Sequence, residues 1–138
     1  MYKICTSIDQ SKKLIELGID VKTADMFWSL NPEVLVPSEY MTEDNCIPCV
    51  DAIPAWSLSA LLGILPDEIS TGEGYQNKYE IKIRRHYGGN NITLYQIAYS
   101  NDKGSGGAWH DMISTSEQEK FVDVCYEMIC WLKENGKI

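Results

Sequence analysis

The sequence predicts a single α+β domain over residues 1–138, with N-terminal helices, an antiparallel β-meander of two or three strands, and a long C-terminal helix packed on one sheet face. Three observations favour this fold. The length of 138 residues suits one domain. The candidate strands follow one another with too little chain between them for helical crossovers, which favours antiparallel pairing. Apolar residues near the C-terminus recur at three- and four-residue spacing, as on one face of a helix.

The N-terminal part predicts two helices. The first begins after Thr6 or Ser7 and ends at Gly18, which suits the left-handed conformation that follows many helices. A short second helix is expected at 22–29, after Asp20. Residues 31–54 have no apolar periodicity and contain four prolines, so we expect a long loop with an edge strand at Val34–Val36.

The most apolar helix is expected at Trp56–Leu65. Ser57 is a candidate N-cap, and Pro66 ends the helix because proline cannot continue the hydrogen-bond ladder. Since this segment is apolar on nearly every side, we expect it to be the central buried element.

A β-hairpin is the clearest local signal. Strands are expected at Tyr79–Tyr87 and Ile92–Tyr99, joined by the Gly and Asn residues at 88–91, which tolerate the positive φ of tight turns. Apolar and polar residues alternate in the first strand, which predicts one buried and one solvated face. Trp109–Ile113 is expected to return as a third strand.

The C-terminal helix is expected to begin after Ser116, which with Glu119 fits a capping box, and to end near Asn135 before Gly136. Its apolar face should pack on the sheet and consists of Phe121, Val124, Cys125, Met128, Ile129 and Leu132.

Composition excludes several classes of protein. Twelve basic and twenty acidic residues give a net charge of −8, which argues against a basic packaging protein and a general nucleic-acid coat. The longest apolar-rich stretch, 55–65, is about half the length that spans a bilayer. The N-terminus lacks the pattern of a signal peptide, and five cysteines do not suggest a disulfide framework. We therefore expect a cytoplasmic protein with reduced thiols and no membrane partner.

The cysteines raise a redox or zinc hypothesis. Cys46-Ile-Pro-Cys49 has the spacing of a redox dithiol or of half a zinc site. The acidic neighbours Glu43 and Asp44 would raise the thiol pKa values, however, which opposes activation. His86 and His110 are the two histidines, and no second pair with this spacing exists. The simpler interpretation is that Cys46 and Cys49 are two ordinary loop cysteines. We therefore expect no catalytic residue, no metal and no cofactor.

A cysteine nucleophile is a further alternative. Cys125, with His110 as its base, would need the two to be close in space. Because Cys125 falls within the apolar face of the C-terminal helix, a core position is the simpler interpretation.

The predicted hairpin carries the candidate binding residues. Residues 1–70 have four bases and eleven acids, whereas residues 75–100 have four bases and one acid. Basic residues interleaved with tyrosines on a sheet can bind single-stranded nucleic acid. A solvated face with cross-strand tyrosine pairs is the alternative. The candidates, which include one tryptophan because tryptophan is common at interfaces, are Lys78, Lys82, Arg84, Tyr87 and Trp109.

Three stretches together resemble a known group of proteins: Thr23–Trp28, Ile53–Pro66 and Glu127–Gly136. They are similar to uncharacterised small acidic proteins of prophage-like or mobile elements in Bacteroides-related gut bacteria. The resemblance implies a phage-like or mobile-element setting and no particular activity. We expect a non-enzymatic intracellular protein-interaction module that binds a protein partner or itself. The alternatives are a nucleic-acid-linked protein that uses the basic hairpin at 78–87, and a small cysteine or zinc protein.

Overall fold

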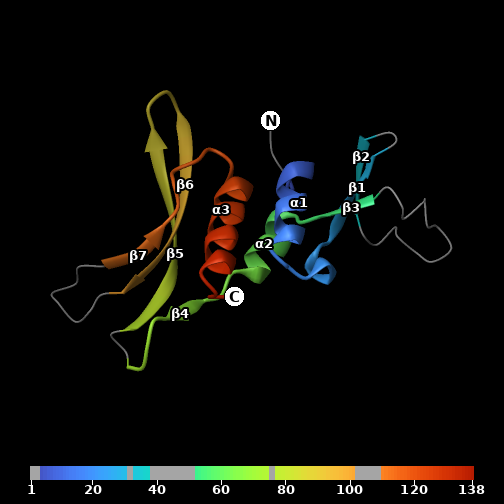
Figure 1. Ribbon diagram of the computed structural model, residues 1–138. Helices are drawn as coiled ribbons and strands as arrows, with labels where there is room; N and C mark the ends of the chain where they lie inside the picture. Colours follow the sequence, from blue (N-terminus) through green and yellow to red (C-terminus); the bar gives the residue numbers. More distant parts are fainter. Residues whose placement is uncertain (1–3, 31–32, 38–51, 75–76, 102–109) are drawn as a thin grey trace. The chain divides into compact units, whose positions relative to one another are not determined.

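The computed structural model describes residues 4–30, 33–37, 52–74, 77–101 and 110–138, which form an α+β protein. The chain divides into two compact units, Met1–Ile64 and Leu65–Ile138. Each unit contains helix and antiparallel sheet, and Figure 1 shows the elements of each. The predicted α+β class and the antiparallel pairing are confirmed.

The first unit begins with helix α1 (Ile8–Glu16), as predicted. Ser7 caps it: the Ser7 side chain accepts from the Gln10 N–H at 3.2 Å, and the Gln10 side chain accepts from the Ser7 N–H at 3.0 Å. This reciprocal pair satisfies two main-chain donors that the first turn leaves unpaired. The helix ends at Leu17, and Gly18 follows with a φ of +89°. Gly18 is therefore the stop that the sequence indicated.

The second helix predicted at 22–29 is wrong. A short 3-10 turn, η1 (Val21–Thr23), is followed by strand β1 (Met26–Leu30). Strand β1 pairs antiparallel on one side with β2 (Glu33–Pro37) and on the other with β3 (Ala52–Ala55). Pairing on both sides outweighs the local pattern, because each residue of β1 gains cross-strand neighbours that a lone helix would lack.

The loop expected at 31–54 is therefore replaced in part by strands. Strand β2 contains the edge strand predicted at Val34–Val36. Strand β3 was not predicted, and residues 38–51, including Cys46 and Cys49, lie outside the described part of the chain.

Helix α2 (Leu58–Ile64) is shorter than the segment predicted as its helix. Ser57 caps it as expected, since its Oγ accepts from the Ala60 N–H at 3.2 Å. The prediction that this helix is the central buried element is wrong, because Leu61 is its one buried residue. Trp56 is fully buried just before the helix, where its indole N–H donates to Thr23 Oγ1 at 2.8 Å.

The second unit contains the predicted meander. Strands β4 (Glu68–Ser70), β5 (Lys78–Gly88), β6 (Ile92–Asn101) and β7 (His110–Ser114) form an antiparallel sheet in the order β4-β5-β6-β7. Strand β4 was not predicted. The turn between β5 and β6 places Asn90 and Asn91 at φ values of +65° and +62°, which confirms the prediction of a left-handed turn there.

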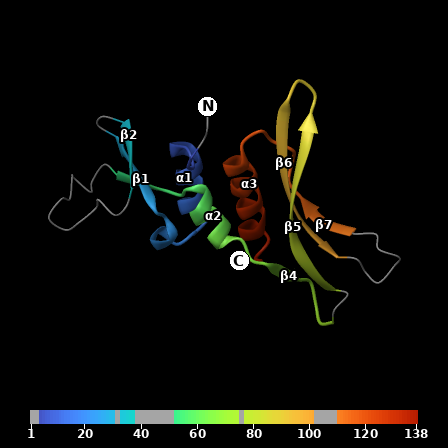
Figure 2. The same cartoon turned by 180° about the vertical axis from the view of Figure 1, so that it is seen from behind.

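Helix α3 (Phe121–Glu134) packs on strand β6 with the predicted apolar face (Figure 2). The Phe121 ring stacks on Tyr95 of β6 with centroids 5.2 Å apart. The predicted capping box at its start is wrong. The helix begins later, after Lys120, with no side-chain cap, and Ser116 Oγ donates to the Glu127 carboxylate at 2.8 Å. Gly136 follows the helix with a φ of +66°, as the sequence indicated.

Candidate interaction edge of strand β5

Strand β5 is much longer than the strand beside it at the edge of the sheet. On its inner side β5 pairs with β6 from Glu80 to Gly88. On its outer side β4 pairs only with Lys78–Glu80, and the Ile81 N–H donates to the Asp67 carbonyl at 2.9 Å. Beyond Ile81, no described strand pairs with the outer side of β5. We call this stretch, residues 83–87, the free edge.

The direction of the main chain along the free edge follows from Ile81. Successive residues of a strand direct their N–H and C=O groups to alternate sides. Because Ile81 donates outward to Asp67, residues 83, 85 and 87 also direct their main-chain groups outward. These groups of Ile83, Arg85 and Tyr87 are hydrogen-bonding groups without a strand partner among the described residues.

The side chains of the same three residues are exposed. Ile83 is 52% exposed and Tyr87 is 81% exposed, and Arg85 is exposed without an ion pair in the described part of the chain. The alternating pattern predicted that Ile83 faces a core, and that prediction is wrong. Tyr79, on the same face, is buried at the end of β5 that β4 covers. Ile83 lies beyond that cover, and α3 packs mainly on β6.

The opposite face of the sheet holds the predicted basic residues, and acids accompany them. The Arg84 guanidinium forms two hydrogen bonds to the Asp111 carboxylate of β7, at 2.8 and 2.7 Å, and Ser100 Oγ also donates to Asp111. Lys82 Nζ lies 3.5 Å from the Glu80 carboxylate. His86 Nε2 lies 3.9 Å from Glu117. Two of the four basic residues of the hairpin, Lys82 and Arg84, thus have an acidic partner within the sheet.

The Arg84–Asp111 pair also shifts the titration of both groups. Hydrogen bonds from Arg84 hold the pKa of Asp111 below its usual value, against a smaller opposing effect of burial. The same bonds to Asp111 raise the pKa of Arg84. Both side chains therefore stay charged at neutral pH.

The structure brings some of the five predicted binding residues together. Lys82 and Arg84 lie two positions apart on the same sheet face, and Lys78 precedes them on that face at the start of β5. Tyr87 lies on the opposite face, near the turn. Trp109 lies outside the described residues. The sequence reasoning missed Ile83 and Arg85. The adjacent Arg84 and Arg85 were a usable signal for Arg85, since one of two consecutive charges must lie on the face that alternation assigns to apolar residues.

The tryptophans divide between core and partly exposed positions. Trp56 is fully buried, whereas Trp28 and Trp131 are half-buried. The Trp28 indole N–H donates to the Thr6 carbonyl at 3.0 Å, so its polar atom is satisfied within the chain.

Cys125, the candidate nucleophile, lies in the core of the second unit. Cys125 is fully buried, and burial raises its thiol pKa to about 12, so the nucleophilic thiolate is scarce at neutral pH. No group of three or more His, Cys, Asp or Glu side chains that could hold a metal occurs in the ranges that the structure describes. Cys46 and Cys49 lie outside those ranges, so their redox or zinc role stays a prediction that metal analysis and thiol titration would test.

No family model matches the chain, and no curated protein or solved structure matches it either. Among the described residues, no helix has both the length and the apolar character needed to cross a membrane.

Proposed function

We propose that the chain is a non-enzymatic protein-interaction module and that the free edge of β5 is its contact surface. The observation that carries this proposal is the combination of outward main-chain groups with exposed side chains at Ile83, Arg85 and Tyr87. An unpaired strand edge is a template for a further strand, and many peptide-binding domains bind their ligands in this way.

The proposal includes the setting that the sequence resemblance implies. In this interpretation the protein belongs to a prophage-like or mobile element and acts in the cytoplasm of a Bacteroides-related gut bacterium. The partner that binds the free edge is then a protein of the element, a protein of the host, or a second copy of the chain.

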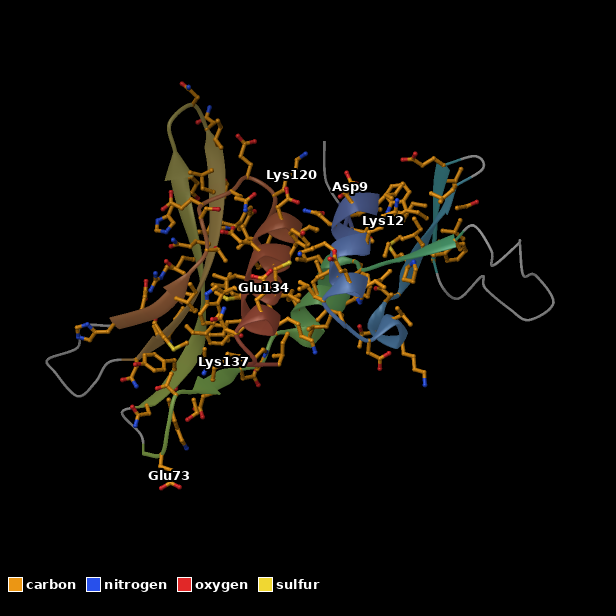
Figure 3. All side chains as sticks on the ribbon, viewed as in Figure 1. Asp9, Lys12, Glu73, Lys120, Glu134 and Lys137 are labelled. Carbon is orange, nitrogen blue, oxygen red and sulfur yellow. The ribbon has the colours of Figure 1, made fainter. Side chains whose placement is uncertain are left out.

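Site-specific photo-crosslinking tests this function. A benzophenone amino acid replaces Tyr87 in one variant and Lys12, an exposed residue of α1 labelled in Figure 3, in the control variant. Irradiation of the cells that make the protein should join position 87, and not position 12, to a discrete protein. Equal products from both positions, or no product from position 87, would contradict the proposal.

A nucleic-acid-linked function is the second candidate. The observation that favours it is the pair of exposed cations Lys78 and Arg85 on the hairpin, in addition to Lys82 and Arg84. Lys78, Lys82 and Arg84 lie on one sheet face and Arg85 lies on the other, and basic residues of this kind can contact phosphates. The test is filter binding of single- and double-stranded DNA and RNA at low salt. Binding that falls steeply with salt and is lost in Arg85→Glu would support this function, and no binding would remove it.

A further inference from the structure

We propose that the free edge of β5 binds an extended acidic segment of a partner protein, which adds to the sheet as a fifth strand. This inference rests on the proposed function and names the class of occupant. It joins two observations: the main-chain groups that β4 leaves unpaired, and a cation on the same edge that no described residue neutralises.

The main chain supplies the general part of the recognition. Strand β5 has 11 residues and β4 has three, so β4 covers one end of the outer side of β5 and leaves the rest open. A strand laid along the free edge would pair its own N–H and C=O groups with those of Ile83, Arg85 and Tyr87. Such pairing favours an extended segment of any sequence.

The side chains supply the specific part. Ile83, Arg85 and Tyr87 lie on one face of the sheet, so three alternate residues of an added strand would lie beside them. Apolar residues beside Ile83 and Tyr87 would cover side chains that are 52% and 81% exposed. A carboxylate beside Arg85 would neutralise a guanidinium that has no ion pair within the described ranges. The preferred segment therefore has the pattern apolar, polar, acidic, polar, apolar.

The opposite face adds to the preference for acidic residues. The polar positions of the added strand would lie beside Arg84 and His86. Arg84 already binds Asp111, and His86 lies near Glu117, so these two contribute less than Arg85 does. The positive charge of Arg84 still disfavours a lysine or arginine beside it in the segment.

Charge argues against a second copy of the chain as the occupant. Antiparallel pairing of two free edges about Arg85 would place this residue opposite itself. Pairing about Arg84 would place that residue opposite itself. Like charges directly opposite one another destabilise a sheet, so these two registers disfavour a second copy, whereas an acidic strand would place opposite charges there.

Peptide binding to the full chain tests the inference. The probe is a fluorescein-labelled seven-residue peptide, Thr-Val-Glu-Glu-Glu-Val-Thr, whose palindromic order suits either strand direction. One control peptide has lysine in place of glutamate. A second control keeps every side chain of the probe but carries N-methyl groups on alternate residues, which removes main-chain donors. Fluorescence anisotropy at low salt measures the affinity.

Four protein variants accompany the wild type. Arg85→Glu reverses the charge at the edge, and Lys12→Glu makes the same change in net charge on α1. Tyr87→Pro removes an outward N–H, and Tyr87→Ala removes the same side chain while keeping that N–H. Because the Tyr87 N–H points away from β6, the proline leaves the β5–β6 hydrogen bonds in place.

The inference expects the acidic peptide to bind the wild type and Lys12→Glu alike, and Arg85→Glu about tenfold more weakly. Arg85→Glu should bind the lysine peptide instead. The N-methylated peptide should not bind, and Tyr87→Pro should bind more weakly than Tyr87→Ala. Equal binding of the N-methylated peptide, a wild-type preference for the lysine peptide, or equal effects of the two charge reversals would overturn the inference.

The two proposals fail in different ways. If the acidic peptide does not bind while position 87 still crosslinks to a protein, the acidic-strand inference is wrong and the interaction function stands. A crosslinked product that is a dimer of the chain also overturns the inference alone. If the acidic peptide does not bind and position 87 gives no crosslinked product, both proposals are wrong.

Discussion

Arg84 and Asp111 form a two-pronged ion pair across the sheet, and the side chains are 31% and 33% exposed. Paired bonds of this kind are the strong form of a surface salt bridge because the planar guanidinium matches the carboxylate. Ser100, fully buried between them on β6, donates a further hydrogen bond to Asp111. The pair thus ties β5 to β7 across β6, and its main role is structural.

The pair should give the protein a stability that depends on acid pH. The pKa of Asp111 is lower in the folded chain than its usual value, so its contribution is present above that usual value of about 3.9 and is lost as pH falls through the folded pKa. Asp111→Asn should lower the free energy of unfolding by about 0.5–1 kcal/mol at neutral pH, an amount typical of an exposed pair with good geometry. The difference should shrink as pH falls below that usual value and vanish once Asp111 is protonated in the folded chain.

Urea denaturation across this pH range measures the effect. Glu73→Gln, which changes an exposed loop carboxylate labelled in Figure 3, is the control and should unfold like the wild type at each pH. An Asp111→Asn variant as stable as the wild type at neutral pH would show that the ion pair contributes nothing.

Cys125 should be unreactive in the folded protein. Burial raises its thiol pKa to about 12 and keeps reagents from the sulfur. Cys125→Ala and the wild type should therefore have the same number of thiols that react with a disulfide reagent under native conditions. In guanidinium the variant should have one reactive thiol fewer. A lower native count in Cys125→Ala would identify an accessible thiol and reopen the cysteine-nucleophile hypothesis.

At the scale of elements, the segment before α3 is held by the carboxylate of Glu127, the seventh residue of the helix. Glu127 accepts from the Ser116 N–H at 3.2 Å, from Ser116 Oγ at 2.8 Å and from Gln118 Nε2 at 2.8 Å. These bonds hold the segment between β7 and α3 against the helix. They replace the capping box that would have used Glu119.

Two substitutions separate these arrangements. Glu127→Ala should lower the free energy of unfolding by about 1–2 kcal/mol, because it leaves the donors of Ser116 and Gln118 without their acceptor. Glu119→Ala should change stability by less than about 0.5 kcal/mol, as is usual for an exposed surface residue. Thermal or urea unfolding measures both. A larger loss in Glu119→Ala than in Glu127→Ala would favour the capping box.

Local patterns were sufficient for elements that local contacts determine. The β5–β6 hairpin follows from alternation and from the Gly and Asn residues of its turn, and α1 follows from its capping residues. Strand β1 does not, because Met26-Phe27-Trp28 is an apolar run that suits a helix or a strand. Its conformation depends on β3, whose Ile53 pairs with Trp28 across 25 positions of the chain.

The candidate site was predictable in part for the same reason. Alternation placed Lys82 and Arg84 on one face of the hairpin. It could not supply Asp111, because a shift in register after Tyr99 aligns Asp111 with Ser100 and so beside Arg84. Such a bulge depends on packing, and this sequence has no marker for it. The free edge of β5 could not be predicted from the sequence either, because it depends on the length of β4.

For the molecule as a whole, a net charge of −8 opposes non-specific aggregation at neutral pH, while the exposed apolar side chains Ile83 and Tyr87 favour it. Repulsion should disappear near the isoelectric point of about 4.7. Turbidity should therefore peak near that pH. The double variant Ile83→Thr/Tyr87→Thr should reduce the peak, because it removes apolar surface from the free edge.

Val21→Thr is the matched control for this experiment, since Val21 is 48% exposed and lies on η1, outside the described strands. It should leave the turbidity peak unchanged. If it reduces the peak as much as the double variant does, general surface hydrophobicity and not the strand edge governs the association.

The spacing of strand partners along the chain has a kinetic consequence. The nine β5–β6 pairs, from Glu80↔Ser100 to Gly88↔Ile92, join residues at most 20 positions apart and close outward from a three-residue turn. A β-hairpin of this kind can form in roughly 1–10 μs. The β1–β3 pairs close larger loops, up to 29 positions for Met26↔Ala55, and cost more chain entropy to begin. The β1–β2 pairs are also local, at most 11 positions apart for Met26↔Pro37. Refolding should therefore start at the β5–β6 and β1–β2 hairpins, and docking of β3 onto β1 should come late.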